Sequence, residues 1–118
     1  MDRLGNNDIY KKASELFDEF INRDSDMLGV DYRGREIVKQ LVRSIGSICA
    51  NIEEGYGRGY GKEYVYFLKV SRGSARESKG WYWRGRKFIK KEIVQERMKV
   101  LDEIIAMLVT TINKLERN

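Results

Sequence analysis

The 118-residue chain contains no proline, no histidine and a single cysteine, Cys49. Without proline, the backbone permits long uninterrupted helices. A lone thiol cannot close an internal disulfide, which excludes a cysteine-stapled secreted scaffold. Without histidine, the chain cannot build a Ser-His-Asp or Cys-His catalytic arrangement, nor a histidine-ligated metal site. We therefore expect a protein that is not an enzyme and that holds no cofactor or metal.

Long apolar runs are also missing. The longest, Ile104 to Val109, is far shorter than the roughly 20 residues that cross a bilayer. The first residues, Met1 to Asp8, are polar and acidic, unlike a signal peptide. Hydrophobic residues still make up 42% of the chain and charged residues 35%, a balance typical of a folded domain. These features predict one cytoplasmic domain over residues 1–118, with no membrane contact.

The net charge of +5 is unevenly distributed along the chain. Residues 1–32 carry −4, residues 33–91 carry +10 and residues 92–118 carry −1. Such a basic central block favours a polyanionic partner, usually RNA or DNA. The alternative is that the block meets the acidic N-terminal segment of a neighbouring subunit.

Apolar residues recur at the three- and four-residue steps of amphipathic helices. A first helix is expected to begin at Asn7 or Asp8, followed by a connection over residues 24–34. A second helix should end near Gly55, and a third should cover residues 62–84. The fourth helix has the most regular spacing, through Val94, Met98, Leu101, Ile105, Leu108, Ile112 and Leu115. Four helices with short connections predict an all-α, antiparallel up-down-up-down four-helix bundle.

Small residues and surplus apolar residues add two expectations. Glycines inside helices cost up to about 1 kcal/mol each relative to alanine. The predicted helices contain Gly46, Gly73 and Gly80, and serines and alanines lie beside them. We therefore expect a close contact between the second and third helices, with Gly73 and Ala75 in it. The fourth helix is apolar over more than one stripe, which predicts oligomerisation; the surplus residues are Ile93, Val100, Ile104 and Val109.

The second connection, residues 55–62, is rich in glycine but lacks the spacing of a phosphate-binding loop. One interpretation is a flexible turn with Gly55 as the C-cap of the second helix. The other is an adaptable RNA contact through Arg58, Tyr56 and Tyr60.

The third helix carries cations at alternating three- and four-residue steps, with no carboxylate among them. Such a stripe could follow a phosphate backbone, and a tryptophan within it could stack on unpaired bases. The alternatives are a solvated face or the docking site of an acidic protein. The candidate nucleic-acid-binding residues are Arg58, Lys69, Arg72, Arg76, Lys79, Trp83, Arg84, Arg86, Lys87 and Lys90.

Residues 43–77 carry three motifs: Asn-Ile-x-Glu-Gly at 51–55, Phe-Leu at 67–68 and Gly-Ser-x-x-Glu at 73–77. This combination resembles the four-helix-bundle proteins encoded in intervening sequences of bacterial 23S rRNA genes. That family includes the accessory variability determinant of diversity-generating retroelements. The resemblance extends over nearly the whole chain in helix order.

The resemblance implies a ring-like homopentamer with a basic surface and no catalytic residues. In retroelement members, the pentamer is a partner of a reverse transcriptase and its RNA. The shared motif residues then look structural, at a helix end and a close helix pair; they are Asn51, Glu54, Gly55, Gly73, Ser74 and Glu77. The leading hypothesis is a non-enzymatic oligomeric scaffold that binds RNA, or a nucleic-acid enzyme, through the third helix. The alternative is a protein–protein adaptor whose basic face meets an acidic partner.

Overall fold

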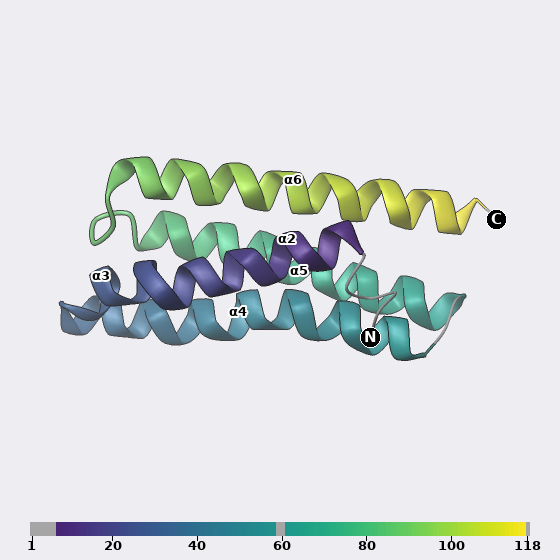
Figure 1. Ribbon diagram of the computed structural model, residues 1–118, viewed down its shortest axis with the longest axis horizontal. Coiled ribbons are helices and arrows are strands. Elements are labelled where there is room, and N and C mark those ends of the chain that lie inside the picture. Colours follow the sequence, from purple (N-terminus) through teal and green to yellow (C-terminus); the bar gives the residue numbers. More distant parts are fainter. Residues whose placement is uncertain (1–6, 59–60, 118) are drawn as a thin grey trace.

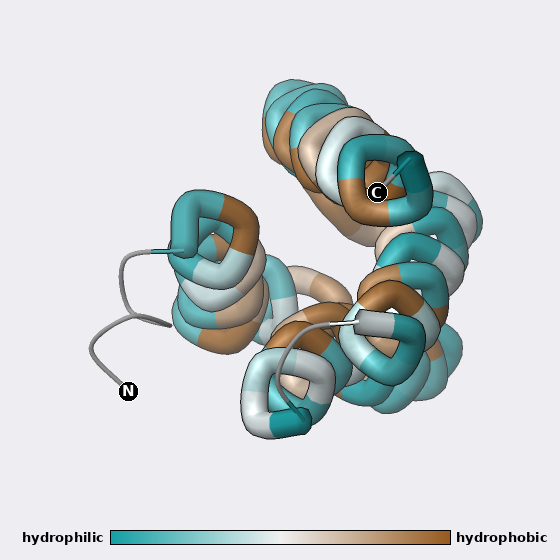
Figure 2. Tube along the Cα trace, turned by 90° about the vertical axis from the view of Figure 1, so that its right-hand side faces the viewer, coloured by the Kyte–Doolittle hydropathy of each residue, from teal (hydrophilic) through white to brown (hydrophobic). Residues whose placement is uncertain are grey.

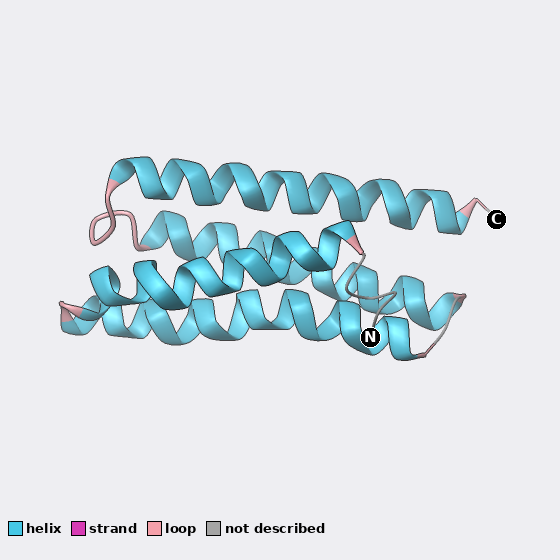
Figure 3. Cartoon of the chain, viewed as in Figure 1, coloured by secondary structure: helices cyan, strands magenta, loops and turns pink. Residues whose placement is uncertain are grey.

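The computed structural model describes residues 7–58 and 61–117, and these residues form four long helical segments (Figure 1). No strand occurs within the described ranges, so the all-α prediction is confirmed (Figure 3). The helices are α2 (Asp8–Glu19), a π-helical turn η1 (Phe20–Asp24), α3 (Ser25–Gly29), α4 (Tyr32–Gly57), α5 (Lys62–Arg84) and α6 (Lys91–Glu116).

The first helical segment is longer than the sequence predicted. The expected connection over residues 24–34 is wrong, because η1 and α3 continue α2 as far as Gly29. Phe20, Asp24 and Leu28 follow one another at four-residue steps and are all fully buried. A buried aspartate interrupts the apolar pattern in the sequence but not the helix. The actual connection is short, and Asp31 ends it by accepting a hydrogen bond from the Arg33 backbone N–H at 2.8 Å.

The end of α4 approaches the first turns of α5 closely. Helix α4 runs two residues beyond Gly55 and its C-cap is Arg58, so the prediction of Gly55 as the C-cap is wrong. A Cβ at position 55 would lie 2.9 Å from Cβ of Phe67 and 3.1 Å from Cδ1 of Tyr64. Glycine at position 55 therefore permits the close approach of the two helices. Gly61 then precedes α5 with a φ of 115°, a left-handed conformation that glycine adopts without strain.

The helices lie along one long axis, and the molecule measures 47 × 24 × 20 Å (Figure 1). Viewed along that axis, α4 and α5 pack together, α2 packs against α4, and α6 packs against α5 and also contacts α2 (Figure 2). Helix α5 contacts both α4 and α6. The fully buried large side chains come from all four segments; they are Leu16, Phe20, Leu28, Leu41, Ile45, Ile48, Ile52, Leu68, Tyr82, Leu101 and Ile104.

Helix α6 buries a wider sector than one stripe because it contacts both α5 and α2. Ile93 and Ile104, two of the surplus apolar residues, are buried within the single chain. They therefore give no argument for oligomerisation. Large apolar side chains are exposed elsewhere in the described residues; they are Ile21, Val30, Tyr32, Val42, Tyr66 and Trp83.

The two ends of α6 differ in how they are capped. Lys90 is the N-cap and makes no side-chain capping hydrogen bond, and Glu92 is the acidic residue of the first turn. At the other end, the Arg117 N–H donates to the carbonyl of Asn113. No described helix is both long enough and apolar enough to cross a membrane.

Candidate nucleic-acid interface

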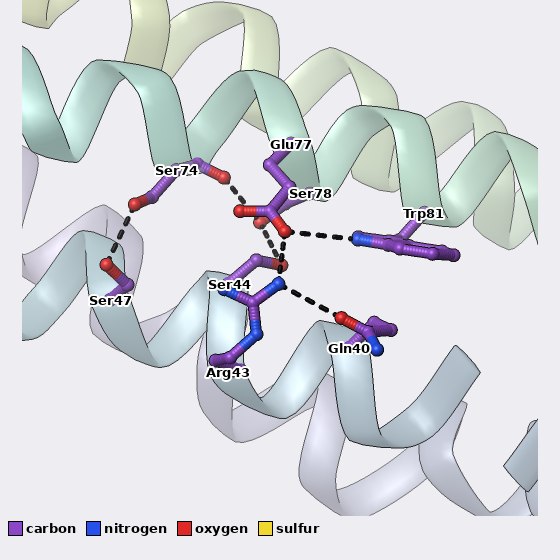
Figure 4. Close-up of polar contacts among 8 residues, drawn as sticks. All are labelled: Gln40, Arg43, Ser44, Ser47, Ser74, Glu77, Ser78 and Trp81. Atoms are coloured by element: carbon purple, nitrogen blue, oxygen red, sulfur yellow. Dashed lines mark hydrogen bonds and ion pairs between the residues drawn. The ribbon is translucent and has the colours of Figure 1, made fainter. Parts of the chain in front are cut away.

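Serines hold α4 and α5 together at mid-length (Figure 4). The hydroxyls of Ser47 and Ser74 lie 2.8 Å apart, and Ser78 donates to Ser44, also at 2.8 Å. Ser71 donates to a backbone carbonyl of α4 at 2.8 Å. These small side chains bring the helix backbones together while satisfying one another's polar atoms. The predicted close contact between the second and third helices is confirmed.

The glycines inside the helices, Gly46, Gly73 and Gly80, do not create this mid-length contact. Gly73 is exposed, and a Cβ at position 73 would meet nothing within 4 Å, so its predicted place in the contact is wrong. A Cβ at Gly80 would approach only Arg84 of the same helix, and one at Gly46 would approach Phe17 of α2 at 3.6 Å. Successive helical residues rotate by about 100°, so residues 73 and 80 lie away from the face that carries the serines. Ala75, in contrast, is fully buried.

Glu77 joins the two helices on the outer side of the serine contact (Figure 4). It forms an ion pair with Arg43 of α4 and accepts a hydrogen bond from the Trp81 indole at 3.3 Å. Gln40 accepts a second bond from Arg43 at 3.0 Å. Within α4, Asn51 donates to the carbonyl of the residue four positions earlier at 2.8 Å. Glu77 therefore stabilises the packing of α5 against α4, and Asn51 stabilises the backbone of α4.

Two cations of the predicted stripe are neutralised by α6. Lys69 Nζ lies 2.8 Å from a carboxylate oxygen of Glu116, and Lys79 Nζ lies 2.5 Å from one of Asp102. The stripe contains no carboxylate along α5 itself, but the neighbouring helix supplies two. Ion pairs with α6 therefore compensate the charges of Lys69 and Lys79.

Arg58, at the end of α4, is also paired. Its guanidinium lies 2.9 Å from Glu54 and 3.9 Å from Glu63, and its Cζ lies 5.7 Å from the centre of the Phe67 ring. Its charge is largely compensated locally. Tyr60, the predicted aromatic neighbour of Arg58, lies outside the described residues.

The remaining candidate cations have no ion-pair partner within residues 7–58 and 61–117. Arg72 is half-buried and the others are exposed; the full set is Arg72, Arg76, Arg84, Arg86, Lys87 and Lys90. Positive charge is densest over residues 84–91, where five cations occur with no carboxylate. We define these five residues together with Trp83 as the basic end; the cations are Arg84, Arg86, Lys87, Lys90 and Lys91. The basic end lies at the α5–α6 connection, on the same side of the molecule as α3 and the start of α4 (Figure 1).

Guanidinium groups stack on aromatic rings at the basic end. Trp83 is 55% exposed, and Cζ of Arg86 lies 3.9 Å from the centre of its ring. Arg86 also donates to the Trp83 carbonyl at 2.8 Å, which fixes the stacked geometry. Arg84 stacks similarly on Trp81 at 5.0 Å. The end therefore presents flat surfaces that combine positive charge with an aromatic face. Tyr82, between the two tryptophans, points into the core.

A buried charged cluster near the basic end was missed by the sequence analysis. Asp24 is fully buried and accepts hydrogen bonds from Arg97 Nε at 2.8 Å, Arg97 Nη2 at 3.1 Å and the Tyr82 hydroxyl at 2.5 Å. Glu19 lies 2.6 Å from the remaining Arg97 nitrogen. Burial disfavours the charged form of Arg97, but the hydrogen bonds and charge of Asp24, with Glu19, outweigh it and raise the pKa of the guanidinium.

The missed cluster did leave a signal in the sequence. Arg97 lies between Ile93 and Leu101 at four-residue steps, in line with the apolar face of α6. A charged residue at such a position requires a buried partner. Which carboxylate supplies it depends on how α2, η1 and α3 pack against α6, and the sequence pattern does not encode that.

No group of three or more Cys, Asp or Glu residues in the described part of the chain could hold a metal ion. Burial raises the pKa of the Cys49 thiol to about 11, so the thiolate is scarce at neutral pH.

The comparisons with known proteins identify the family. The model of a family described as "23S rRNA-intervening sequence protein" matches residues 5–110. The chain belongs to this family, and the matched range includes the basic end and the α4–α5 contact. No curated protein and no solved structure matches the chain.

Proposed function

We propose that this member of the 23S rRNA-intervening sequence family is a non-enzymatic scaffold that binds RNA through the basic end. The observation that carries the proposal is the unpaired charge of residues 84–91 beside the exposed, guanidinium-stacked Trp83. Cations without carboxylate partners are free to neutralise phosphates, and each such contact releases counterions. The aromatic face adds a surface on which an unpaired base can stack. The family description is compatible with RNA association.

The proposal includes assembly of the subunits. Each subunit would contribute an up-down-up-down bundle to a homopentamer, in keeping with the family resemblance. Exposed apolar side chains such as Ile21 and Val42 support burial against another chain. A pentamer would also repeat the basic end five times, so a weak contact in one subunit would gain avidity. Light scattering tests the assembly, and a concentration-independent monomer near 13.9 kDa would refute it.

The proposal also includes a reverse transcriptase as a protein partner, because the retroelement members of the family that this chain resembles act with one. The same basic end would meet the enzyme or the RNA that it carries. Co-purification of a tagged reverse transcriptase with the wild-type chain, in the presence and absence of ribonuclease, separates direct binding from tethering by RNA.

The test of RNA binding uses two matched pairs of neutralised cations. Arg86→Gln with Lys87→Gln removes unpaired charges, whereas Lys12→Gln with Lys79→Gln removes the same number of paired charges. Affinity for single-stranded RNA is measured by fluorescence anisotropy over a salt series. The first pair should lower the slope of log K against log salt by about 1.4, at about 0.7 per phosphate contact, and the second pair should change it little.

The outcomes separate the two candidate functions. Equal slopes for wild type and the Arg86–Lys87 pair would refute RNA binding at the basic end. Absence of RNA binding by the wild type at low salt would favour the adaptor hypothesis, in which the same cations meet an acidic protein. A comparable loss in both variants would show that only net charge matters.

A further inference from the structure

A second feature of α5 lies at the end opposite the basic end. An open cleft of about 770 Å³ separates the first turns of α5 from the last turn of α6. Val65 and Leu115 form apolar walls, and both side chains are half-buried against the core. Tyr66 also lines the cleft and is 60% exposed. The volume falls in the range of pockets that hold small organic groups.

The Tyr66 side chain is positioned but not covered. Its ring meets that of Phe67 edge to face, with centres 5.1 Å apart and planes at 77°. This contact restricts the orientation of the tyrosine ring while leaving most of the residue open to solvent. An exposed aromatic ring beside two aliphatic walls favours a flat apolar group as the occupant.

The charge at the cleft indicates that the occupant is anionic. Lys62 and Lys69 line it, together with Glu116. Glu116 is held by Lys69 at 2.8 Å, so these two charges compensate each other. Lys62 is exposed and has no ion-pair partner in the described part of the chain, so its charge remains available. A planar group combined with a negative charge is the chemistry of a nucleotide.

We propose that this cleft binds one unpaired nucleotide of the RNA, with the base against Tyr66 and the phosphate at Lys62. The inference rests on the proposed function and adds a binding site for single-stranded RNA to it. The basic end and the cleft then occupy the two ends of α5, a helix of roughly 35 Å. Between them lie Arg72 and Arg76, which have no ion-pair partner among the described residues. A bound strand would run along α5.

The test separates stacking from charge. Tyr66→Ala should weaken binding of a short labelled single strand roughly 5- to 100-fold, because stacking on one aromatic ring is lost. The salt slope should stay unchanged, since no phosphate contact is removed, and the affinity for a duplex of the same length should change little. Tyr66→Phe should bind like the wild type. Lys62→Gln should instead lower the salt slope by about 0.7.

A matched control and the contrary results complete the design. Tyr32→Ala removes an exposed tyrosine at the start of α4, outside the cleft, and should leave RNA affinity unchanged. Tyr66→Ala could leave the affinity for a single strand unchanged while the Arg86–Lys87 double variant still weakens binding. This result would refute nucleotide binding in the cleft and leave the proposed function standing. Equal losses for single strand and duplex, with a lowered melting temperature, would assign Tyr66 a structural role and also overturn it. A wild type that binds no RNA would overturn both proposals.

Discussion

The buried cluster around Asp24 makes the sharpest prediction about stability. Asp24→Ala removes the acceptor of two hydrogen bonds from Arg97 and one from Tyr82, within a fully buried site. The Arg97 guanidinium, whose residue is 4% exposed, would keep only Glu19 as a partner. Breaking one side of a buried ion pair typically costs about 3–5 kcal/mol. The corresponding fall in melting temperature for a domain of this size is roughly 10–20 °C.

Three further variants show whether the cost arises from unpaired buried charge. Tyr82→Phe removes only one donor to a carboxylate and should cost about 1.5–3 kcal/mol. Asp24→Leu combined with Arg97→Met removes both charges and should be less destabilising than either single removal. Asp102→Ala breaks the exposed pair with Lys79 and should cost less than about 1 kcal/mol.

Urea denaturation monitored by circular dichroism measures these differences. If Asp24→Ala lowers the free energy of unfolding no more than Asp102→Ala does, the cluster contributes no more stability than a surface ion pair. If the Asp24–Arg97 double replacement costs as much as the sum of its single changes, the two side chains are not coupled. Either result would refute the reasoning.

Three other predictions concern packing and reactivity. Ala75→Leu should overpack the core around this fully buried residue and lower the free energy of unfolding by about 1–3 kcal/mol, measured by urea denaturation. Gly73→Ala should do the opposite and raise the melting temperature, because the new Cβ meets nothing and helix propensity improves by up to about 1 kcal/mol. Cys49, with its pKa raised to about 11, should react with iodoacetamide at a rate that still rises tenfold per pH unit between pH 8 and 10, whereas a free cysteine levels off near its ordinary pKa of about 8.5.

Sequence periodicity predicted the helices best where apolar and polar residues were cleanly separated. The bounds of α5 at residues 62–84 were predicted, and so was the close contact between α4 and α5. The predicted connection over residues 24–34 was wrong because Asp24 is a polar residue that is nevertheless fully buried. Its ion pair with Arg97 makes this burial possible. Gly73 was misplaced because a small side chain signals close packing only on the face that meets a neighbour.

The candidate interface could be predicted only in part for a similar reason. Counting charges along the sequence located the unpaired cations of the basic end, although only Arg84 lies in α5 and the other four lie in the α5–α6 connection or at the start of α6. The same count could not reveal that Asp102 and Glu116 of α6 reach across to Lys79 and Lys69. Which side chains of two helices pair depends on how each helix is rotated about its own axis. The sequence pattern of one helix does not specify that rotation.

The start of α6 has an electrostatic consequence for the whole molecule. A helix N-terminus carries the positive end of the helix dipole and several unbonded N–H groups, and it is normally stabilised by acidic or capping side chains. Here Lys90 and Lys91 occupy the N-cap and first position, with no side-chain cap and with Glu92 alone opposing them. In the free protein, these two positive side chains therefore lie beside the positive end of the helix dipole and are repelled by it. Anions that bind the basic end would relieve this repulsion, so ligand binding and thermal stability should be linked in this protein.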